Sequence, residues 1–317
     1  MTSFLTPYRH GYSVRFSPFH GDRLVCATSQ YYGLAGGGTL FVLDLTPEGN
    51  LVEYSAYEWQ DGLFDVVWSE TDPNIVVAGS GDGVLHIWDV NTSDPLQRMK
   101  EHKKEVYSVD WSPARREPLI LSASWDRTIK LWDPLRQFSL ATYEGHEQLV
   151  YNAMWSPLVP SCFASVSGDG MLSIWNSKIS EKASMTIKAH DAEVLTCSWC
   201  KFDQNLLATG GSDGLIRGWD IRFLGNHIFE QIGCDYAVRK IQFSPHMPSI
   251  LASVAYDFTT RIWDFKLSSQ PCETIRHHSE FVYGLDFNNH VKGQIADCGW
   301  DSLVHVFTPR SLCGRLF

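Results

Sequence analysis

Aspartate and histidine residues that could form acid–base pairs recur at fixed intervals along this chain of 317 residues. A carboxylate beside an imidazole is an arrangement that enzymes use to transfer protons. A group that recurs in most units of a chain cannot be one active site, so we interpret these residues as structural hydrogen-bonding partners. The aspartates are Asp82, Asp126, Asp169, Asp213, Asp257 and Asp301, and the histidines are His102, His146, His190 and His278.

Two short motifs raise the question of a metal site. Cys197 and Cys200 form a C-x-x-C motif on a predicted strand, where residues three apart point to opposite faces and cannot chelate one ion. His277 adjoins His278, but adjacent residues seldom share one metal and His278 occupies the repeated structural position. The glycine-rich segment 33–38 lacks the lysine and the helix of a phosphate-binding loop. We therefore predict no metal, no cofactor and no enzymatic activity.

The chain is built from repeats that end in Trp-Asp or a close variant. Five equivalent tryptophans are spaced 44, 43, 44 and 44 residues apart, and the register extends to one further unit on each side, with Phe307 in the last tryptophan position. The tryptophans are Trp88, Trp132, Trp175, Trp219 and Trp263. We expect a single domain over 1–317 with seven units, at about 8–45, 59–90, 102–134, 146–177, 190–221, 234–265 and 278–308.

Each unit contains three apolar strand signals separated by proline and glycine, and a more variable fourth, which predicts a four-stranded antiparallel blade. Seven such units predict an all-β, seven-bladed β-propeller, and the Trp-Asp endings resemble the WD-repeat family over nearly the whole chain. In that family the histidine links the turn aspartate to a Ser/Thr and the tryptophan. Gly37 and Cys234 replace the aspartate and the histidine in two units, so we expect those blades to be less tightly tied.

An open propeller would leave two sheet edges unpaired, so one end of the chain must complete the last blade. The candidates are Phe4 to Thr6 and Leu312 to Phe317. The formal charge of −10 and the lack of a Lys/Arg block argue against nucleic acid as a partner. Without a leader peptide or an apolar run of 18 residues, we expect a cytoplasmic protein that is not inserted in a membrane and whose eight cysteines are reduced.

By analogy with the WD-repeat family, three loop positions in each unit face the broad upper side near the central channel. These positions are strongly aromatic, and aromatic residues are typical anchors of protein interfaces. The alternative is that several rings pack between blades or plug the channel. The positions are His10, Tyr12, Gly62, Phe64, Glu105, Tyr107, Trp125, Leu149, Tyr151, Glu193, Leu195, Ala237, Arg239, Tyr256, Phe281, Tyr283 and Trp300.

Phrases outside the repeat pattern resemble a narrower family, the receptors for the type 2 peroxisomal targeting signal. They include HGYSVRFSP at 10–18, DGLFDVVWSE at 61–70 and HHSEFVYGLDF at 277–287. The resemblance implies a cytosolic receptor that shuttles to the peroxisome and binds cargo enzymes by an N-terminal nonapeptide, Arg/Lys, Leu/Val/Ile, five residues, His/Gln, Leu/Ala. It also implies a co-receptor and peroxisomal docking machinery as partners. A general WD-repeat scaffold is the alternative.

An amphipathic helix with a basic residue requires an apolar groove and a nearby carboxylate. We predict that the partners of the basic residue are among Asp61, Asp65, Glu105 and Glu193. The residues predicted to line the apolar groove or its co-receptor rim are Phe64, Tyr107, Trp125, Tyr151, Tyr256, Tyr283 and Trp300.

Overall fold

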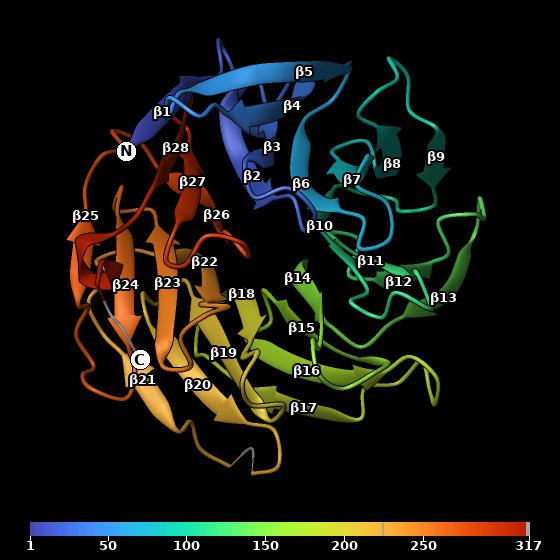
Figure 1. The fold of residues 1–317 in the computed structure, drawn as a ribbon. Coiled ribbons are helices and arrows are strands. Elements are labelled where there is room, and N and C mark those ends of the chain that lie inside the picture. Colours follow the sequence, from blue (N-terminus) through green and yellow to red (C-terminus); the bar gives the residue numbers. More distant parts are fainter. Residues whose placement is uncertain (224, 315–317) are drawn as a thin grey trace.

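The computed structural model describes residues 1–223 and 225–314. Its strands form seven antiparallel sheets of four strands each, arranged around a central axis (Figure 1). Two short 3-10 turns, η1 (Tyr31–Gly33) and η2 (Arg310–Leu312), are the only helical segments in this part of the chain. The described residues therefore contain no helix long and apolar enough to cross a bilayer. The predicted all-β, seven-bladed propeller is confirmed.

The first four blades follow one another along the chain, each from its innermost to its outermost strand. Their strands are β2 (His10–Phe16), β3 (Arg23–Ser29), β4 (Gly38–Leu45) and β5 (Leu51–Trp59); β6 (Leu63–Trp68), β7 (Ile75–Ser80), β8 (Val84–Asp89) and β9 (Gln97–Lys100); β10 (Val106–Trp111), β11 (Ile120–Ser124), β12 (Ile129–Trp132) and β13 (Ser139–Tyr143); β14 (Val150–Trp155), β15 (Cys162–Ser167), β16 (Met171–Asn176) and β17 (Met185–Lys188).

The last three blades continue the order, and the seventh combines strands from the two ends of the chain. Their strands are β18 (Val194–Trp199), β19 (Leu206–Gly211), β20 (Ile216–Asp220) and β21 (Phe229–Gln231); β22 (Val238–Phe243), β23 (Ile250–Ala255), β24 (Thr260–Asp264) and β25 (Glu273–Ile275); β26 (Val282–Phe287), β27 (Ile295–Gly299), β28 (Leu303–Phe307) and β1 (Thr2–Leu5).

The N-terminal strand closes the ring. β1 pairs antiparallel with β28, with Thr2 opposite Val306 and Leu5 opposite Leu303 (Figure 1). Phe4 packs in the core cluster that joins the first and seventh blades. Of the two predicted closing segments, the N-terminal one is therefore the one that pairs, one or two residues earlier than expected. In the other candidate, Leu312 lies in η2, and residues 315–317 are outside the described part of the chain.

Apolar side chains between neighbouring blades form the core. In the cluster that joins the first two blades, Leu40 and Leu63 are buried together with Trp88. Trp132 and Trp263 are likewise at most 1% exposed. Alternation along each strand places one row of side chains against each neighbouring blade, which explains why strands buried on both sides are almost continuously apolar.

Within a blade, the repeated histidine and aspartate belong to a hydrogen-bonded chain. In the fourth blade Trp175 Nε1–H donates to Ser165 Oγ (2.8 Å), and the Ser165 hydroxyl donates to His146 Nε2 (2.7 Å). His146 Nδ1–H then donates to Asp169 (3.0 Å). Burial opposes ionisation of Asp169, but the bonds from His146 and from backbone amides hold its pKa below the ordinary value. The corresponding chains in the third and fifth blades are His102, Asp126, Ser122 and Trp132, and His190, Asp213, Thr209 and Trp219.

Blades that lack the repeated histidine have other partners for the turn aspartate. In the sixth blade, where Cys234 stands in the histidine position, Arg261 Nη1 forms a buried ion pair with Asp257 Oδ2 (2.7 Å). In the second blade Trp59 Nε1–H donates to Asp82 Oδ2 (3.3 Å). The departure at Cys234 thus replaces a histidine–aspartate hydrogen bond with an arginine–aspartate ion pair and does not leave the aspartate without a partner.

Replacement of Ser165 by alanine is expected to lower the free energy of unfolding by about 2 kcal/mol. The change leaves both Trp175 Nε1–H and His146 Nε2 buried without a hydrogen-bonding partner, which typically costs about 1 to 3 kcal/mol. Urea unfolding followed by tryptophan fluorescence measures the effect. The exposed Ser93→Ala variant is the control, and equal midpoints for the two variants would contradict a structural role for the chain.

Candidate peptide-binding face

A continuous cluster of nine aromatic rings covers the end of the central channel at which the innermost strands begin. We call it the aromatic face. Six blades supply the rings. Five innermost strands (β2, β6, β10, β14 and β26) each carry one ring near the start, and the connections between strands supply the other four. Its members are Tyr12, Phe64, Tyr107, Trp125, Tyr151, Tyr256, Phe281, Tyr283 and Trp300. All seven aromatic residues that the sequence predicts for the groove are therefore brought together.

The rings divide into a buried layer and an accessible layer. Tyr12 (4%), Phe64 (5%), Tyr107 (8%) and Tyr283 (5%) are buried, so they form the floor and offer little surface to a ligand. The accessible members are half-buried: Trp125, Tyr151, Tyr256, Phe281 and Trp300. The two interpretations of these aromatic residues, as a plug of the channel and as an accessible surface, each hold for part of the set.

Ring contacts run almost completely around the axis. From Tyr107 the contacts pass to Phe64 (5.6 Å between centroids), on to Tyr12 (4.9 Å) and then to Tyr283 (4.8 Å). Tyr151 extends one end and Tyr256 the other. Tilted and edge-on contacts at these distances are the favourable geometry for aromatic pairs. The arc is open only at the fifth blade.

Arg239, from β22, lies at the centre of the arc. Its guanidinium carbon is 4.8 Å from the ring centroids of both Tyr107 and Tyr283. The side chain is only 6% exposed, so these cation–π contacts form in a largely desolvated setting, where they are strongest. Burial raises the pKa of Tyr283 far above its ordinary value, so the phenol stays neutral. Arg239 therefore fixes the floor of the aromatic face from within.

Beneath the arc the channel is almost filled. The enclosed space lined by Tyr12, Tyr107, Leu195, Arg239 and neighbouring residues is only about 10 Å³. Such a space holds at most one water molecule, so a ligand cannot enter the channel from this side. A partner of the aromatic face must lie across it.

Carboxylates lie at the open part of the arc and on its margin. Glu193 is exposed, and Tyr151 donates its hydroxyl proton to Glu193 Oε2 over 3.4 Å. Glu105 and Asp61 are half-buried, and Asp61 Oδ1 accepts a hydrogen bond from Gly62 N (2.7 Å). These three predicted acidic residues are accessible to a basic side chain on the aromatic face.

The prediction that Asp65 faces a ligand needs correction. Asp65 lies below the aromatic layer and is 4% exposed. It accepts hydrogen bonds from Ser13 Oγ (2.6 Å) and Val109 N (3.0 Å) and lies 3.5 Å from Lys240 Nζ. Burial opposes ionisation, but Lys240 and Arg15 hold the pKa of Asp65 below its ordinary value. Asp65 thus joins the first, second, third and sixth blades inside the channel.

Sequence reasoning missed an exposed aromatic rim beside the first blade. In the connection between β3 and β4, Tyr31 and Tyr32 have left-handed backbone angles (φ 43° and 57°) and are 67% and 48% exposed. Tyr32 stacks on His10 at 4.1 Å, and Tyr8 is 89% exposed. We call Tyr8, Tyr31, Tyr32 and Leu34 the first-blade rim. The signal in the sequence was the departure of this unit from the short turn around an aspartate that the other six units share.

Comparison with known proteins places the chain among relatives with one shared name. The family model described as "WD domain, G-beta repeat" matches residues 51–89, 93–133, 137–176, 181–220 and 225–264. The mouse "Peroxisomal targeting signal 2 receptor" is 48% identical over 304 residues, which cover 96% of this chain and 95% of the relative. The human protein of the same name is 49% identical, with coverage of 88% and 86%. The chain belongs to the family of peroxisomal targeting signal 2 receptors.

The family extends to plants, and the fold extends further. The Arabidopsis thaliana "Peroxisome biogenesis protein 7" is 40% identical over 311 residues and 97% of each chain. The crystal structure of the WD40 β-propeller domain of Doa1 superimposes with a TM-score of 0.80 over 97% of each chain, at 19% identity. The likeness to Doa1, at 19% identity, concerns the fold alone.

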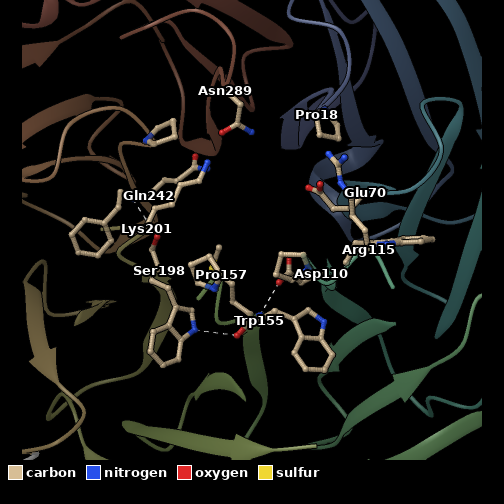
Figure 2. A pocket seen from close by; sticks show the side chains of 16 residues that line it. Pro18, Glu70, Asp110, Arg115, Trp155, Pro157, Ser198, Lys201, Gln242 and Asn289 are labelled. Carbon is tan, nitrogen blue, oxygen red and sulfur yellow. Dashed lines mark hydrogen bonds between the residues drawn. The ribbon is translucent and has the colours of Figure 1, made fainter. Parts of the chain in front are cut away.

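At the opposite end of the channel this member of the receptor family has an open cavity of about 400 Å³ (Figure 2). Glu70 and Arg115 lie on one side of it, and Lys201 and Gln242 lie across from them. Asp110 lies between these groups, and its Oδ2 accepts a hydrogen bond from Trp155 N of the next blade (2.8 Å). Desolvation raises the pKa of Asp110 to about 7, against the attraction of Arg15.

Replacement of Asp110 by asparagine is expected to make the protein more stable above pH 7. The unfolded carboxyl titrates near pH 4 and the folded one near pH 7, so Asp110 contributes stability that is complete below about pH 4 and is lost as pH rises through about 7. Asparagine keeps an acceptor for Trp155 N. Urea unfolding at pH 5 and pH 8 should show a difference between variant and wild type that grows by about 2 kcal/mol at the higher pH. Parallel pH dependence would show that Asp110 is ionised at pH 5.

Proposed function

We propose that this chain binds the N-terminal type 2 peroxisomal targeting signal of cargo proteins as an amphipathic helix lying across the aromatic face. The receptor shuttles with its cargo between the cytoplasm and the docking machinery of the peroxisome. The observation that carries this proposal is a nearly closed arc of aromatic rings whose upper side is accessible and whose lower side is filled, in a chain whose relatives are named receptors for this signal. A filled channel favours an elongated ligand over a small molecule.

The dimensions of the signal suit such a surface. In the nonapeptide of the form Arg/Lys, Leu/Val/Ile, five residues, His/Gln, Leu/Ala, the first and eighth positions are seven residues apart, as are the second and ninth. Two turns of helix bring each pair onto one side, and nine residues extend about 13 Å. The apolar side of the helix then covers half-buried rings such as Tyr151 and Trp300, which supply affinity by burying apolar area.

The carboxylates on the margin of the aromatic face fix the position of the signal helix along it. The basic first residue of the signal lies near Glu193 and Glu105. The Glu193 carboxylate accepts a hydrogen bond from Tyr151, and the backbone carbonyl of Glu105 accepts one from the backbone N–H of Trp125. Asp61 lies farther round the arc, in the turn before Phe64, and is the third candidate. A charge-assisted hydrogen bond to one of these carboxylates contributes on the order of 2 kcal/mol.

A co-receptor completes the site in this proposal. A helix is about 10 Å wide, so a single signal helix cannot cover both the arc and the first-blade rim. Leu34 and Tyr31 of that rim are 88% and 67% exposed, which is unfavourable for a surface without a partner. We assign the first-blade rim to the co-receptor, which contacts the exposed side of the signal helix.

Fluorescence anisotropy with a labelled nonapeptide of the stated form tests the function. We expect binding that is lost when the first arginine of the peptide is replaced by glutamate and that strengthens when a co-receptor is added. The salt dependence should be moderate, because one or two ion pairs are involved. Binding of other partners together with no binding of the nonapeptide under either condition would favour the alternative, a general WD-repeat scaffold.

A further inference from the structure

The seventh blade keeps the histidine and the turn aspartate of the network, His278 and Asp301, but departs from the repeat at the other two positions. Where the other networks have serine or threonine, this blade has Asp297 on β27, and where they have tryptophan it has Phe307, which has no N–H to donate. Two additional imidazoles occupy the same space, His277 from the loop before β26 and His305 from β28. Two additional histidines and a carboxylate thus stand where the other networks have a Ser–Trp pair.

The three imidazoles lie against one another, and Asp297 contacts two of them. Asp297 is 0% exposed, and its carboxylate oxygens lie 2.9 Å from His277 Nε2 and 3.1 Å from His278 Nε2. One potential ligand nitrogen from each of His277, His278 and His305 lies within 4.8 Å of those from the other two. The adjacent residues His277 and His278 therefore do point to a common centre, contrary to the expectation from sequence. Ligand atoms of a tetrahedral zinc ion lie about 3.3 Å apart, so only small side-chain shifts are needed.

His305 has no partner in this arrangement. Its side chain is buried, with the residue 4% exposed, and neither ring nitrogen forms a hydrogen bond; the same holds for His277 Nδ1. Buried polar groups in folded proteins are almost always satisfied, and each exception is unfavourable by about 1 to 3 kcal/mol. A cation between His305 and Asp297 would satisfy a ring nitrogen that is otherwise unpaired.

The surroundings match the outer shell of a metal site. Asp301 accepts a hydrogen bond from His278 Nδ1–H (2.9 Å), which turns the Nε2 lone pair of a neutral His278 toward Asp297. Two acceptors that face each other require a proton or a metal ion between them. Thr260 Oγ1–H donates to Asp297 Oδ2 (2.5 Å) and orients the carboxylate. A carboxylate behind a ligating histidine and a donor behind a ligating carboxylate are both typical of zinc sites.

We propose that His277, His278, His305 and Asp297 bind a structural zinc ion in the seventh blade. Three imidazole nitrogens and one carboxylate oxygen form a closed tetrahedral set that suits Zn²⁺. Asp297 and Asp301 together balance its two positive charges. The ion joins the loop between the sixth and seventh blades to β27 and β28, and β28 pairs with the N-terminal strand β1. It therefore stabilises the blade at which the two ends of the chain meet.

Metal content and cobalt spectroscopy test the site directly. The full-length protein, dialysed against a weak chelator, should retain about one zinc per chain by elemental analysis. After the zinc is removed, Co²⁺ should produce the intense visible absorption of a tetrahedral site, and Zn²⁺ should abolish that absorption stoichiometrically. Zinc should also raise the thermal midpoint of the apoprotein by about 3 °C or more, because a ligand that binds only the folded state stabilises it.

Two variants and one control separate binding from misfolding. Asp297→Ser restores the residue type that the other blades use, and His305→Leu removes the unpaired imidazole; both should lose the cobalt absorption and the thermal shift. In His86→Leu, the change is made at the equivalent strand position of the second blade, so both signals should persist. Wild-type protein that holds less than about one tenth of a zinc per chain and shows no tetrahedral cobalt spectrum would overturn the proposal. So would variants Asp297→Ser and His305→Leu that keep both signals.

Discussion

Replacement of Asp65 by leucine is expected to lower the free energy of unfolding by about 3 to 5 kcal/mol. Removal of one partner from a buried ion pair leaves the other charge uncompensated. Here Lys240 and Arg15 both lose an anion that burial prevents water from replacing, and Val109 N loses its acceptor. The first, second, third and sixth blades lose a common contact. Urea unfolding measured at pH 7 gives the size of the effect.

The double variant Asp65→Leu/Lys240→Met separates the charge effect from packing. It removes the cation together with the anion, so it should recover at least half of the loss in the single variant. Lys240→Met alone leaves Asp65 beside Arg15 and should have a smaller effect than Asp65→Leu. Near-normal stability of Asp65→Leu combined with loss of peptide binding would return Asp65 to the set of ligand contacts.

The different outcomes for Asp65 and Phe64 show what a repeat pattern can predict. Phe64 stands at a position that recurs in every blade, so its place on the upper side follows from the geometry of the repeat. Asp65 does not stand at such a position, and its acidic side chain alone does not place it on the upper side. One residue farther along β6, the chain lies below the aromatic layer, and only the three-dimensional packing of Ser13, Val109 and Lys240 around it shows that.

The aromatic face was predictable as a set but not as layers. Strand alternation and the repeat place Tyr107 and Tyr151 on the same side of the propeller. Whether a ring becomes floor or surface depends on how closely the innermost strands approach the axis and on what fills the centre. Arg239 fills it, and its contacts with Tyr107 and Tyr283 come from blades that are far apart in the sequence. Because those contacts join residues that are distant in the sequence, the spacing of residues does not predict them.

The first-blade rim was not predictable for a related reason. Repeat reasoning assigns roles by equivalence between units, and the segment from Tyr31 to Gly37 has no equivalent in the other blades. Tyr12 donates its hydroxyl proton to the carbonyl of Tyr32 (2.8 Å), which anchors the segment to the aromatic face. The same limit applied to His277, whose neighbours His305 and Asp297 are 28 and 20 residues away in the sequence and adjoin it only in the folded blade.

Reversal of the charges of Glu105 and Glu193 together is expected to weaken binding of the nonapeptide by about 100-fold or more. Each carboxylate contributes on the order of 2 kcal/mol if it contacts the basic residue, a tenfold change corresponds to about 1.4 kcal/mol, and lysine adds repulsion to the loss. The fold should not change, because Glu193 is exposed and Glu105 is half-buried on the margin of the face. Fluorescence anisotropy of the labelled peptide measures the affinity.

A control variant and a second peptide separate a direct contact with the peptide from a general effect of surface charge. The control Glu48→Lys reverses one exposed carboxylate in the connection between β4 and β5, on the opposite side of the propeller, and should bind the peptide normally. A peptide whose first arginine is replaced by glutamate should bind the double variant better than it binds wild type, since the lysines now face an opposite charge. That reversal of preference distinguishes a direct contact from a general change in surface potential, which would weaken with added salt and would affect Glu48→Lys in the same direction. Wild-type affinity of the double variant would leave Asp61 as the remaining acidic partner on the aromatic face.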